Sequence, residues 1–403
     1  DEKMNTIHFL SRLILFLFFP GFLSQALGQY GDWKHAGSMY LVTSSAGADL
    51  PASAVLKNFP LLVRLNEDYF NFSQAKPGGK DVRFSSKGKP LDFQIERWDA
   101  ERGEADIWVR IPIIRGKDQQ AIQMHWGKEQ VSSESNGEQV FRTAEGFSAV
   151  WHLGDNLEDA TSNNLDGVNR PDAPTTNTTG MIGDAQEFGV NQILVIRPPG
   201  AKPDRRVTCM PSGNADRTMS AWVNPTSFEG RNWAQASIGG WGEPERGQKP
   251  HMGLSYFTMT GRGQPRFHLY GFDPRCASPL PRREWRHVAL AVSGDMVRFY
   301  VNGVLDKTIN NNGDLVSKLG TLKTPASTPV DLGDHGNGRG PFNGALDEVR
   351  FESVARSRNW LKLCFENQKP LQSLVGPLVQ DGDDFSVSEA NLVMKENASI
   401  TLS

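Results

Sequence analysis

The chain has 403 residues, of which 38% are hydrophobic and 22% are charged, and its formal net charge at pH 7 is −3. This balance describes a globular chain long enough for two or three domains. No block of lysine or arginine stands out, which argues against nucleic acid or an anionic membrane as a partner. The 40 glycines and 24 prolines imply many turns and favour an all-β chain of short strands.

The first 28 residues have the pattern of a secretory signal peptide. Lys3 and Arg12 precede the apolar run "LILFLFFPGFL", and "ALG" at 26–28 supplies the small residues that cleavage requires. The run is about half as long as the roughly 20 apolar residues of a membrane span. We therefore expect residues 1–28 to be removed, the mature chain to begin at Gln29, and the protein to be exported. No other stretch is apolar enough to predict a membrane span.

A first all-β domain is predicted over 29–127, where apolar and polar residues alternate. In "LDFQIE", Phe93 and Ile95 point to one face, while the polar residues between them and Glu96 point to the other. The run "ADIWVRIPII" alternates in the same way, with Trp108 on the second face. The pattern predicts half-buried strands with one face in solvent.

Residues 128–146 are polar and are predicted to link this domain to a second all-β domain at 147–370. The clearest strands of the second domain are "MSAWVNP", "WRHVALAVSG" and "MVRFYVNGVLDKTI". The last contains Asn302-Gly303, a strong hairpin-turn signal because both residues accept positive φ. Residues 371–403 are predicted to begin a further β domain or to form a linker.

The three cysteines are an odd number, and export makes a disulfide feasible. Cys209 and Cys276 lie in loop-like sequence and are the hypothesised pair. Cys364 lies in "NWLKLCFENQ" and is predicted to be a buried free thiol.

Two parts of the chain are similar to known families. The segments "FPLLVRLN", "FNFSQAKPGGKDVRFSSKGKPLDFQIERWD", "ADIWVRIP" and "IQMHWGK" resemble the DUF2341 family, a domain of unassigned function. The segments "AVWHLGDNLEDATSNNLDG", "MIGDAQEF", "RTMSAWVNP", "EWRHVALAVSGDMVRFYVNGVL" and "FNGALDEVRFESVARS" resemble the LamG branch of the concanavalin A-like lectin/glucanase superfamily. The resemblance implies an all-β fold, in which a β-sandwich DUF2341 domain is followed by a concanavalin A-like jelly roll.

The superfamily also contains glycoside hydrolases, whose retaining members need two carboxyl groups about 5 Å apart. In its β-glucanases these come from one strand with the pattern Glu-x-Asp-x-x-Glu. In "EADIWV" Val109 replaces the second glutamate, and "DEVRFE" at 347–352 lacks the spacing. His152 and His287 fall in strand-like sequence, where a hydrogen-bonded imidazole in the core or on a sheet face is expected. We therefore predict no catalytic residues and no enzyme activity.

The leading functional hypothesis is an exported, non-catalytic recognition module that binds carbohydrate or cell-envelope partners, in the periplasm or at the cell surface of a bacterium. Exposed aromatic rings stack on sugars, and the candidates are Trp233, Trp241 and Tyr270, with core packing as the alternative role for each. The order of the two domains also resembles the periplasmic head of TolQ/ExbB-type proton-channel proteins. That alternative predicts membrane spans beyond Ser403. A glycoside hydrolase is the third hypothesis, disfavoured by the missing carboxylate pattern.

The loop "WHLGDNLEDATSNNLDG" at 151–167 concentrates acidic and amide side chains. Residues 159–167 match the family's turn Asp-x-Ser-Gly-Asn-Gly-x-Asp-Gly, and the resemblance implies that Asp347 meets this turn and shares a structural calcium ion with it. Calcium takes about six to eight oxygen ligands. We predict carboxylate ligands from Asp159 and Asp347, with Asn164 or a main-chain carbonyl completing the shell.

Asp155 and Asp166 are alternate members of this predicted calcium site. Ser162 and Asn164 stand where the family usually has glycines, which alters the shape of the loop. The competing interpretation is that Asp159 only caps a turn through its own backbone, while Asp347 pairs with a neighbouring arginine.

Overall fold

A computed structural model describes residues 29–189, 192–196, 206–228, 236–243, 253–269, 273–294, 296–309, 322–334 and 340–380. The predicted signal peptide at 1–28 lies outside the described residues, as do Trp233 and Tyr270. Within the described ranges, no helix has the length and apolar character needed to cross a membrane.

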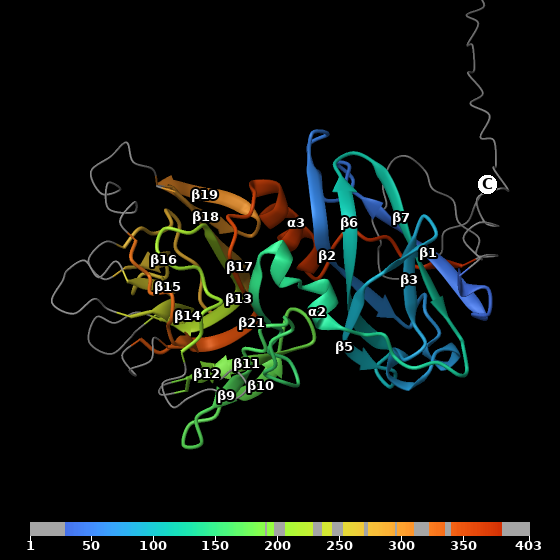
Figure 1. The fold of residues 1–403 in the computed structure, drawn as a ribbon, viewed down its shortest axis with the longest axis horizontal. Helices are drawn as coiled ribbons and strands as arrows, with labels where there is room; N and C mark the ends of the chain where they lie inside the picture. Colours follow the sequence, from blue (N-terminus) through green and yellow to red (C-terminus); the bar gives the residue numbers. More distant parts are fainter. Residues whose placement is uncertain are drawn as a thin grey trace, which may run out of the picture.

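The first domain consists of two antiparallel sheets around one apolar core, on the right in Figure 1. Its strands are β1 (His35–Val42), β2 (Val55–Asn66), β3 (Arg83–Ser86), β4 (Lys89–Leu91), β5 (Phe93–Asp99), β6 (Glu104–Arg115), β7 (Gln119–Trp126) and β22 (Val379–Gln380). Five strands form one sheet in the order β22-β1-β7-β3-β4, and β2-β6-β5 form the other. Short 3-10 turns at Phe72–Gln74 and Pro77–Gly79 precede β3.

The second domain consists of two larger antiparallel sheets, so the all-β prediction is confirmed. One contains β8 (Phe147–Trp151), β10 (Thr176–Thr179), β11 (Asp184–Phe188), β13 (Arg217–Ser227), β17 (Arg286–Ser293), β18 (Met296–Val301), β19 (Val304–Ile309) and β21 (Asn343–Glu352). The other contains β9 (Gly167–Asn169), β12 (Leu194–Ile196), β14 (Ser237–Gly242), β15 (Leu254–Met259), β16 (Pro265–His268) and β20 (Val330–Leu332). The predicted hairpin turn at Asn302-Gly303 joins β18 to β19, with φ values of +49° and +71°.

Helices α2 (Gly137–Val140) and α3 (Arg358–Gln368) lie between the two domains (Figure 1). Ser357 caps α3 by accepting a hydrogen bond from the Trp360 N–H. The apolar face of α3 packs on β2, where the rings of Trp360 and Phe59 are 5.0 Å apart. These residues belong to one cluster that contains core residues of both domains. The two domains therefore share a hydrophobic core.

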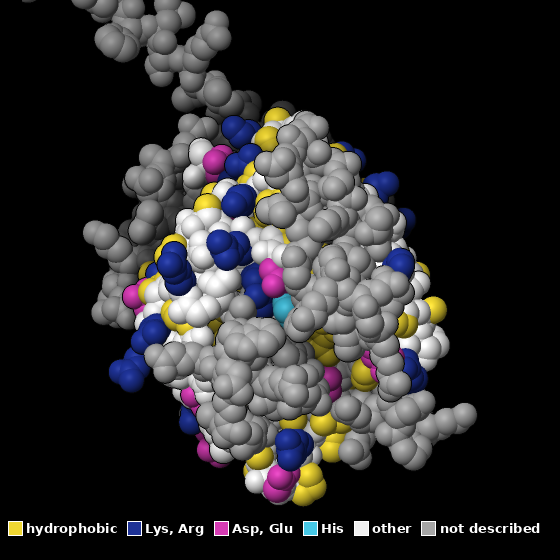
Figure 2. Space-filling model, turned by 90° about the vertical axis from the view of Figure 1, so that its left-hand side faces the viewer, with side chains coloured by type: hydrophobic (Ala, Val, Ile, Leu, Met, Phe, Trp, Pro, Cys, Tyr) yellow, Lys and Arg dark blue, Asp and Glu magenta, His cyan; other side chains and the backbone are white. Residues whose placement is uncertain are grey.

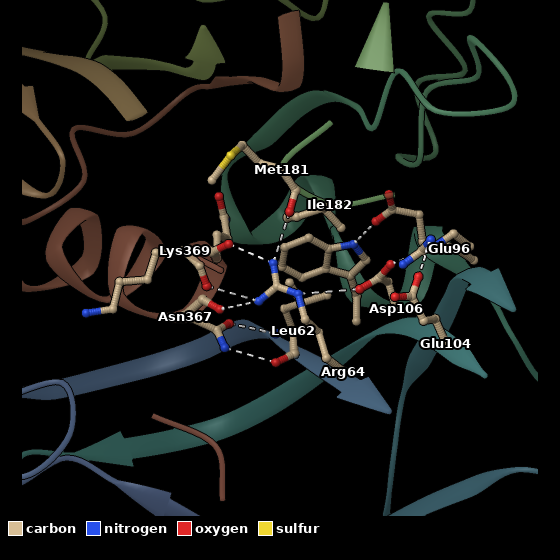
Figure 3. Close-up of polar contacts among 12 residues, drawn as sticks. Leu62, Arg64, Glu96, Glu104, Asp106, Met181, Ile182, Asn367 and Lys369 are labelled. Atoms are coloured by element: carbon tan, nitrogen blue, oxygen red, sulfur yellow. Dashed lines mark hydrogen bonds and ion pairs between the residues drawn. The ribbon is translucent and has the colours of Figure 1, made fainter. Parts of the chain in front are cut away.

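Arg64 on β2 joins three segments of the chain at the domain junction (Figure 3). Its guanidinium donates to the main-chain carbonyls of residues 367–369 and of Met181, at 2.7 to 3.3 Å. Its Nε lies 3.5 Å from Asp106 Oδ1. The last carbonyls of a helix have no partner within the helix and carry partial negative charge. Arg64 therefore stabilises the end of α3 and attaches it to the first domain.

The side chain of Asn367 makes a second polar attachment at this junction. Its Oδ1 accepts the N–H of Leu62 at 2.7 Å, and its Nδ2 donates to the Leu62 carbonyl at 2.9 Å. A buried main-chain group without a partner is destabilising. The two hydrogen bonds supply the partners that a neighbouring strand would supply on this side of β2.

The second domain also covers faces of β5 and β6 that were predicted to be in solvent. Trp108 is fully buried and packs against Phe141, with ring centres 5.7 Å apart. The Glu96 side chain is only 8% exposed. Alternation correctly placed the strands, but the prediction of one solvent face was wrong, because the second domain packs there.

The connection and the C-terminal residues also pack on the first domain. In the predicted linker at 128–146, Val140 and Phe141 are fully buried, and the main-chain N–H of Asn136 donates to Phe93. Of residues 371–403, those up to 380 are described, and β22 pairs with β1. Residues 371–380 therefore extend a sheet of the first domain and do not begin a further domain.

The predicted disulfide between Cys209 and Cys276 is wrong, because both are free thiols. The N–H of Cys276 donates to Pro265 at the start of β16, whereas Cys209 follows Val207, which pairs with Thr328 just before β20. Strands β15 and β14 lie between β16 and β20, so β16 and β20 are three strand spacings apart. At about 4.8 Å per spacing the distance is about 14 Å, which is beyond the reach of a disulfide. Cys364 is a buried free thiol, as predicted.

We predict that Arg64→Met lowers the free energy of unfolding by about 3–5 kcal/mol, because it leaves the carbonyls at the end of α3 without a buried cation and removes one of the two arginines beside Asp106. The control is Arg102→Met, where the replaced side chain is 75% exposed and the expected change is below about 0.5 kcal/mol. Urea denaturation followed by tryptophan fluorescence measures both. Equal unfolding midpoints for the two variants would show that the Arg64 contacts do not stabilise the junction.

A second prediction concerns His287 on β17, which is buried beside Trp222. Burial lowers the pKa of His287 to about 3, below the value near 6.5 of an unfolded chain. Because the unfolded chain binds this proton first, stability falls as the pH drops from about 6 to 4, by about 1.4 kcal/mol per pH unit. The unfolding free energy of His287→Gln should not show this decrease between about pH 6 and pH 4. Parallel pH profiles for the two proteins would contradict the prediction.

Candidate functional site

The loop that follows β8 is organised by the carboxylate of Asp159. This buried group accepts hydrogen bonds from the main-chain N–H groups of Val150, Thr161 and Leu165 and from the Thr161 hydroxyl, at 2.8 to 3.0 Å. Burial raises the pKa of Asp159, and these donors oppose the increase. Both oxygens are therefore used within the loop, as the turn-capping interpretation expects.

Asp347 and Asn164, the other two predicted calcium ligands, have separate environments. Asp347 Oδ2 accepts the N–H groups of Met181 and Ile182, at 2.7 and 3.0 Å, and its buried Oδ1 has no hydrogen-bond partner in the described structure. Asn164 is exposed, has φ +50°, and donates to the Ser162 carbonyl. Calcium binding by this set stays a prediction.

A cavity of about 340 Å³ lies at the domain junction. Four segments line it: residues 94–97 of β5, residues 135–138 before and within α2, part of the loop at 152–164, and residues 183–184 at the start of β11. The sheet of the first domain and the loop of the second therefore form opposite walls. The cavity exists only where the two domains meet.

The lining of this cavity is acidic and rich in amides. Six carboxylates line it: Glu96, Glu138, Asp155, Glu158, Asp159 and Asp184. The lining cation Arg97 is already paired with Glu104 and Asp106 of the first domain, at 2.9 and 2.8 Å. Asn156 and Glu158 are exposed, whereas His152 and Asp159 are buried. The exposed residues therefore form the rim and the buried ones the inner end.

At the inner end, His152 lies between two carboxylates from different domains. Its Nδ1 is 2.5 Å from Glu348 Oε1 and 3.3 Å from Glu96 Oε2, and its Nε2 is 3.2 Å from Gln94 Oε1. Glu348 Oε2 accepts from Arg350 Nε and Nη2 at 3.1 and 2.5 Å. The side chains of this cluster are nearly inaccessible to solvent, so each polar atom depends on its neighbours for a partner.

The three groups have different proton affinities. Burial raises the pKa of Glu96 well above its usual value, and His152 opposes the increase. Burial alone lowers the pKa of His152, but Glu348 and Glu96 more than offset it, so the net change is upward. Burial disfavours the charged form of Glu348, yet His152 and Arg350 hold its pKa at about 2. The arrangement stabilises a cation between the two carboxylates.

Glu348 occupies an irregular position in β21. The register of β21 against β13 shifts between Ser220 and Trp222, and Glu348 has φ +52°, in the left-handed region that non-glycine residues rarely adopt. Asp347 and Glu348 are both fully buried, although neighbouring residues of a regular strand point to opposite faces. Strained positions of this kind are concentrated at functional sites.

The sequence pattern alone does not identify this cluster. His152 was assigned a core or sheet-face role, and Glu96 was placed on a solvent face. The adjacent acids in "LDEVRF" were the available signal, and they drew attention to Asp347 instead of Glu348. Among the described His, Cys, Asp and Glu side chains, Glu96, His152 and Glu348 form the one group of three whose potential ligand atoms lie within 4.8 Å of one another.

Of the three aromatic residues predicted to stack on sugars, Trp241 is described, and its environment does not support that role. Trp241 is fully buried and its indole N–H donates to the Pro211 carbonyl, so it belongs to the core and offers no face to a sugar. Trp233 and Tyr270 lie outside the described residues. On the end of the second domain, Figure 2 shows hydrophobic side chains of the described residues only in small separate areas.

Two family models match parts of the chain. Residues 78–154 match the model described as "Domain of unknown function (DUF2341)", and residues 204–362 match that of the concanavalin A-like lectin/glucanases superfamily. No curated protein matches the chain.

Several solved structures are distantly similar. One is domain 4 of AbnA, a GH43 extracellular arabinanase from Geobacillus stearothermophilus, in complex with arabinotriose, with 19% identity and a TM-score of 0.40 over 54% of this chain and 97% of that one. Another is a Ruminococcus gnavus sialidase CBM40 bound to α2,3-sialyllactose, with 17% identity and a TM-score of 0.30 over 38% and 82% of the two chains. A third is the binding domain of botulinum neurotoxin DC in complex with rat synaptotagmin II, with 10% identity and a TM-score of 0.41 over 56% and 53%.

The two family matches follow the chain in the order of the two domains described above, and the first extends into the loop after β8. The chain therefore carries a DUF2341 domain, matched over residues 78–154, followed by a concanavalin A-like lectin/glucanase domain, matched over residues 204–362.

Proposed function

We propose that this chain is an exported, non-catalytic recognition module that binds a glycan in the cavity at the domain junction. The observation that carries the proposal is the cavity itself. Its volume of about 340 Å³ lies at the lower end of the range of about 300–1,000 Å³ typical of small-ligand sites. A cavity of this size suits one or two sugar rings.

The chemistry of the rim supports a hydroxyl-rich ligand. Asp155, Asn156 and Glu158 are exposed on the loop wall, and Asn136 and Glu138 are exposed on the opposite wall. Carboxylates accept hydrogen bonds, and amides both donate and accept them. Sugar hydroxyls have matching donors and acceptors. Export, inferred from residues 1–28, would expose such a site to glycans of the cell envelope.

The buried carboxylates do not favour hydrolysis. Glu348 is about 1% exposed, does not line the cavity, and is held by Arg350 and His152. A retaining hydrolase needs both carboxyl groups to reach the scissile bond from opposite sides. A glycan in the cavity can approach Glu96 but cannot enter between Glu96 and Glu348. Binding without cleavage is the function that this geometry supports best.

A glycan array followed by calorimetric titration of its best ligand tests the proposal. Asn156→Ala should weaken binding about 2- to 10-fold, because one lost hydrogen bond corresponds to about 0.5–1.5 kcal/mol. The matched control is Asp172→Ala, an exposed polar residue of the same domain that does not line the cavity. A blank array, or equal losses in both variants, would contradict glycan binding in this cavity.

Thermal melting tests the calcium site predicted at Asp159, Asn164 and Asp347. An ion that binds only the folded chain, at 100 times its dissociation constant, adds about 2.7 kcal/mol of stability. The melting temperature should then be higher in calcium than in chelator, and Asp347→Ala should abolish the difference. Equal melting temperatures for the unsubstituted chain in both conditions would leave Asp159 as a turn cap only.

A further inference from the structure

We propose that Glu96, His152 and Glu348 form a binding site for a divalent transition metal, of the zinc class, at the inner end of the junction cavity. This inference goes beyond glycan recognition and uses different residues from the predicted calcium site. The three ligands come from β5 of the first domain and from two segments of the second, the residue after β8 and β21. A bound ion would therefore connect the two domains.

The ligand atoms converge on one point. His152 Nδ1, one oxygen of Glu96 and one oxygen of Glu348 all lie within 4.8 Å of one another. Around a tetrahedral zinc ion, with bonds of about 2.0–2.2 Å, neighbouring ligand atoms are about 3.3–3.5 Å apart. The observed 3.3 Å between His152 Nδ1 and Glu96 Oε2 fits this spacing. The 2.5 Å between Nδ1 and Glu348 Oε1 must lengthen by about 1 Å.

Each of the three ligands is held in place by a second residue. His152 Nε2 faces the Gln94 carbonyl oxygen at 3.2 Å, so Nε2 keeps its hydrogen. Nδ1, which faces Glu348, is then the nitrogen that would bind a metal once its proton has left. Trp108 Nε1 donates to Glu96 Oε2 at 2.5 Å. Figure 3 shows Glu96 in this contact, beside the junction residues Arg64 and Asp106. Such outer contacts orient metal ligands and fix the histidine tautomer.

For Glu348 the two oxygens have separate partners. Oε2 receives both hydrogen bonds from Arg350, at 3.1 and 2.5 Å, while Oε1 faces His152. The guanidinium therefore orients the carboxylate without occupying the oxygen that would bind the ion. In His152 and Glu348, one atom is anchored and another is directed at the common point. In Glu96, Oε2 itself both accepts from Trp108 and faces His152 Nδ1.

The charges around His152 favour a divalent cation. Three carboxyl groups, those of Glu96, Glu348 and Asp347, interact electrostatically here, beside the one guanidinium of Arg350. Arg97 is paired with Glu104 and Asp106. A divalent cation between Glu96 and Glu348 would relieve the repulsion among these carboxyl groups. When the metal binds, the proton on His152 Nδ1 leaves to solvent and the nitrogen lone pair forms the new bond.

The donor set and its surroundings define the class of metal. An imidazole nitrogen with two carboxylates suits zinc and its first-row neighbours, whereas calcium is bound by oxygen ligands alone. Glu96 and His152 both line the cavity. A fourth coordination position would therefore face the cavity and be filled by water or by an oxygen of a ligand.

Titration of the purified chain with zinc chloride, by calorimetry and without any glycan, tests this inference. We expect one zinc ion per chain. His152→Gln and Glu348→Gln should each weaken zinc binding by more than tenfold, and Gln94→Leu should weaken it about 10- to 100-fold by releasing the imidazole. The matched control His35→Gln, which removes a histidine of the first domain outside the cavity, should bind zinc like the unsubstituted chain.

Circular dichroism melting of each variant separates loss of the site from loss of the fold. If the ligand variants do not fold, Gln94→Leu still tests the site, because it retains all three ligands. Absence of zinc binding by the folded chain would overturn the inference. Unchanged zinc affinity in His152→Gln would overturn it too. So would calcium binding as tight as zinc binding in the unsubstituted chain, if His152→Gln abolished that calcium binding. Because the assay contains no glycan, its failure leaves the glycan proposal to be judged by its own titration.

Discussion

The burial of the Arg64 guanidinium at the end of α3 is the interaction on which the arrangement of the molecule depends. A buried arginine is stable only if its donors find acceptors, because desolvating an unpaired charge is strongly unfavourable. Here the acceptors come from the end of α3, from Met181 of the second domain and from Asp106 of the first (Figure 3). The contacts are formed only when both domains and the helix are in place, so they fix one relative orientation.

That orientation converts two sandwich surfaces into an interior. Once α2 and the loop after β8 cover β5 and β6, Trp108 becomes core, and Glu96 is buried beside His152 and Glu348. The cavity and the charged cluster are consequences of the same packing. Neither belongs to one domain: the first family model matches Glu96 and His152 but ends at residue 154, and Glu348 lies in the match of the second. A function assigned from either domain alone would miss this site.

The loop after β8 shows why acidic composition by itself did not identify a metal site. The Asp159 carboxylate satisfies main-chain N–H groups of its own loop, which would otherwise be buried without partners. In the cluster of Glu96, His152 and Glu348, by contrast, the potential ligand atoms face one another. What separates the two is the direction in which oxygen atoms point, and residue type does not encode this.

The sequence by itself determined the all-β class, the order of the two domains and the hairpin at Asn302-Gly303, because strand alternation and turn chemistry are local properties. It could not determine which strand faces would be covered, so it placed Glu96 in solvent and did not foresee that residues 379–380 pair with β1. Nor could it bring together His152 and Glu348, which are 196 residues apart. Only the tertiary structure decided the cavity and the cluster. Both arise where segments far apart in the chain pack together, and the local alternation of apolar and polar residues does not indicate which distant segments will meet.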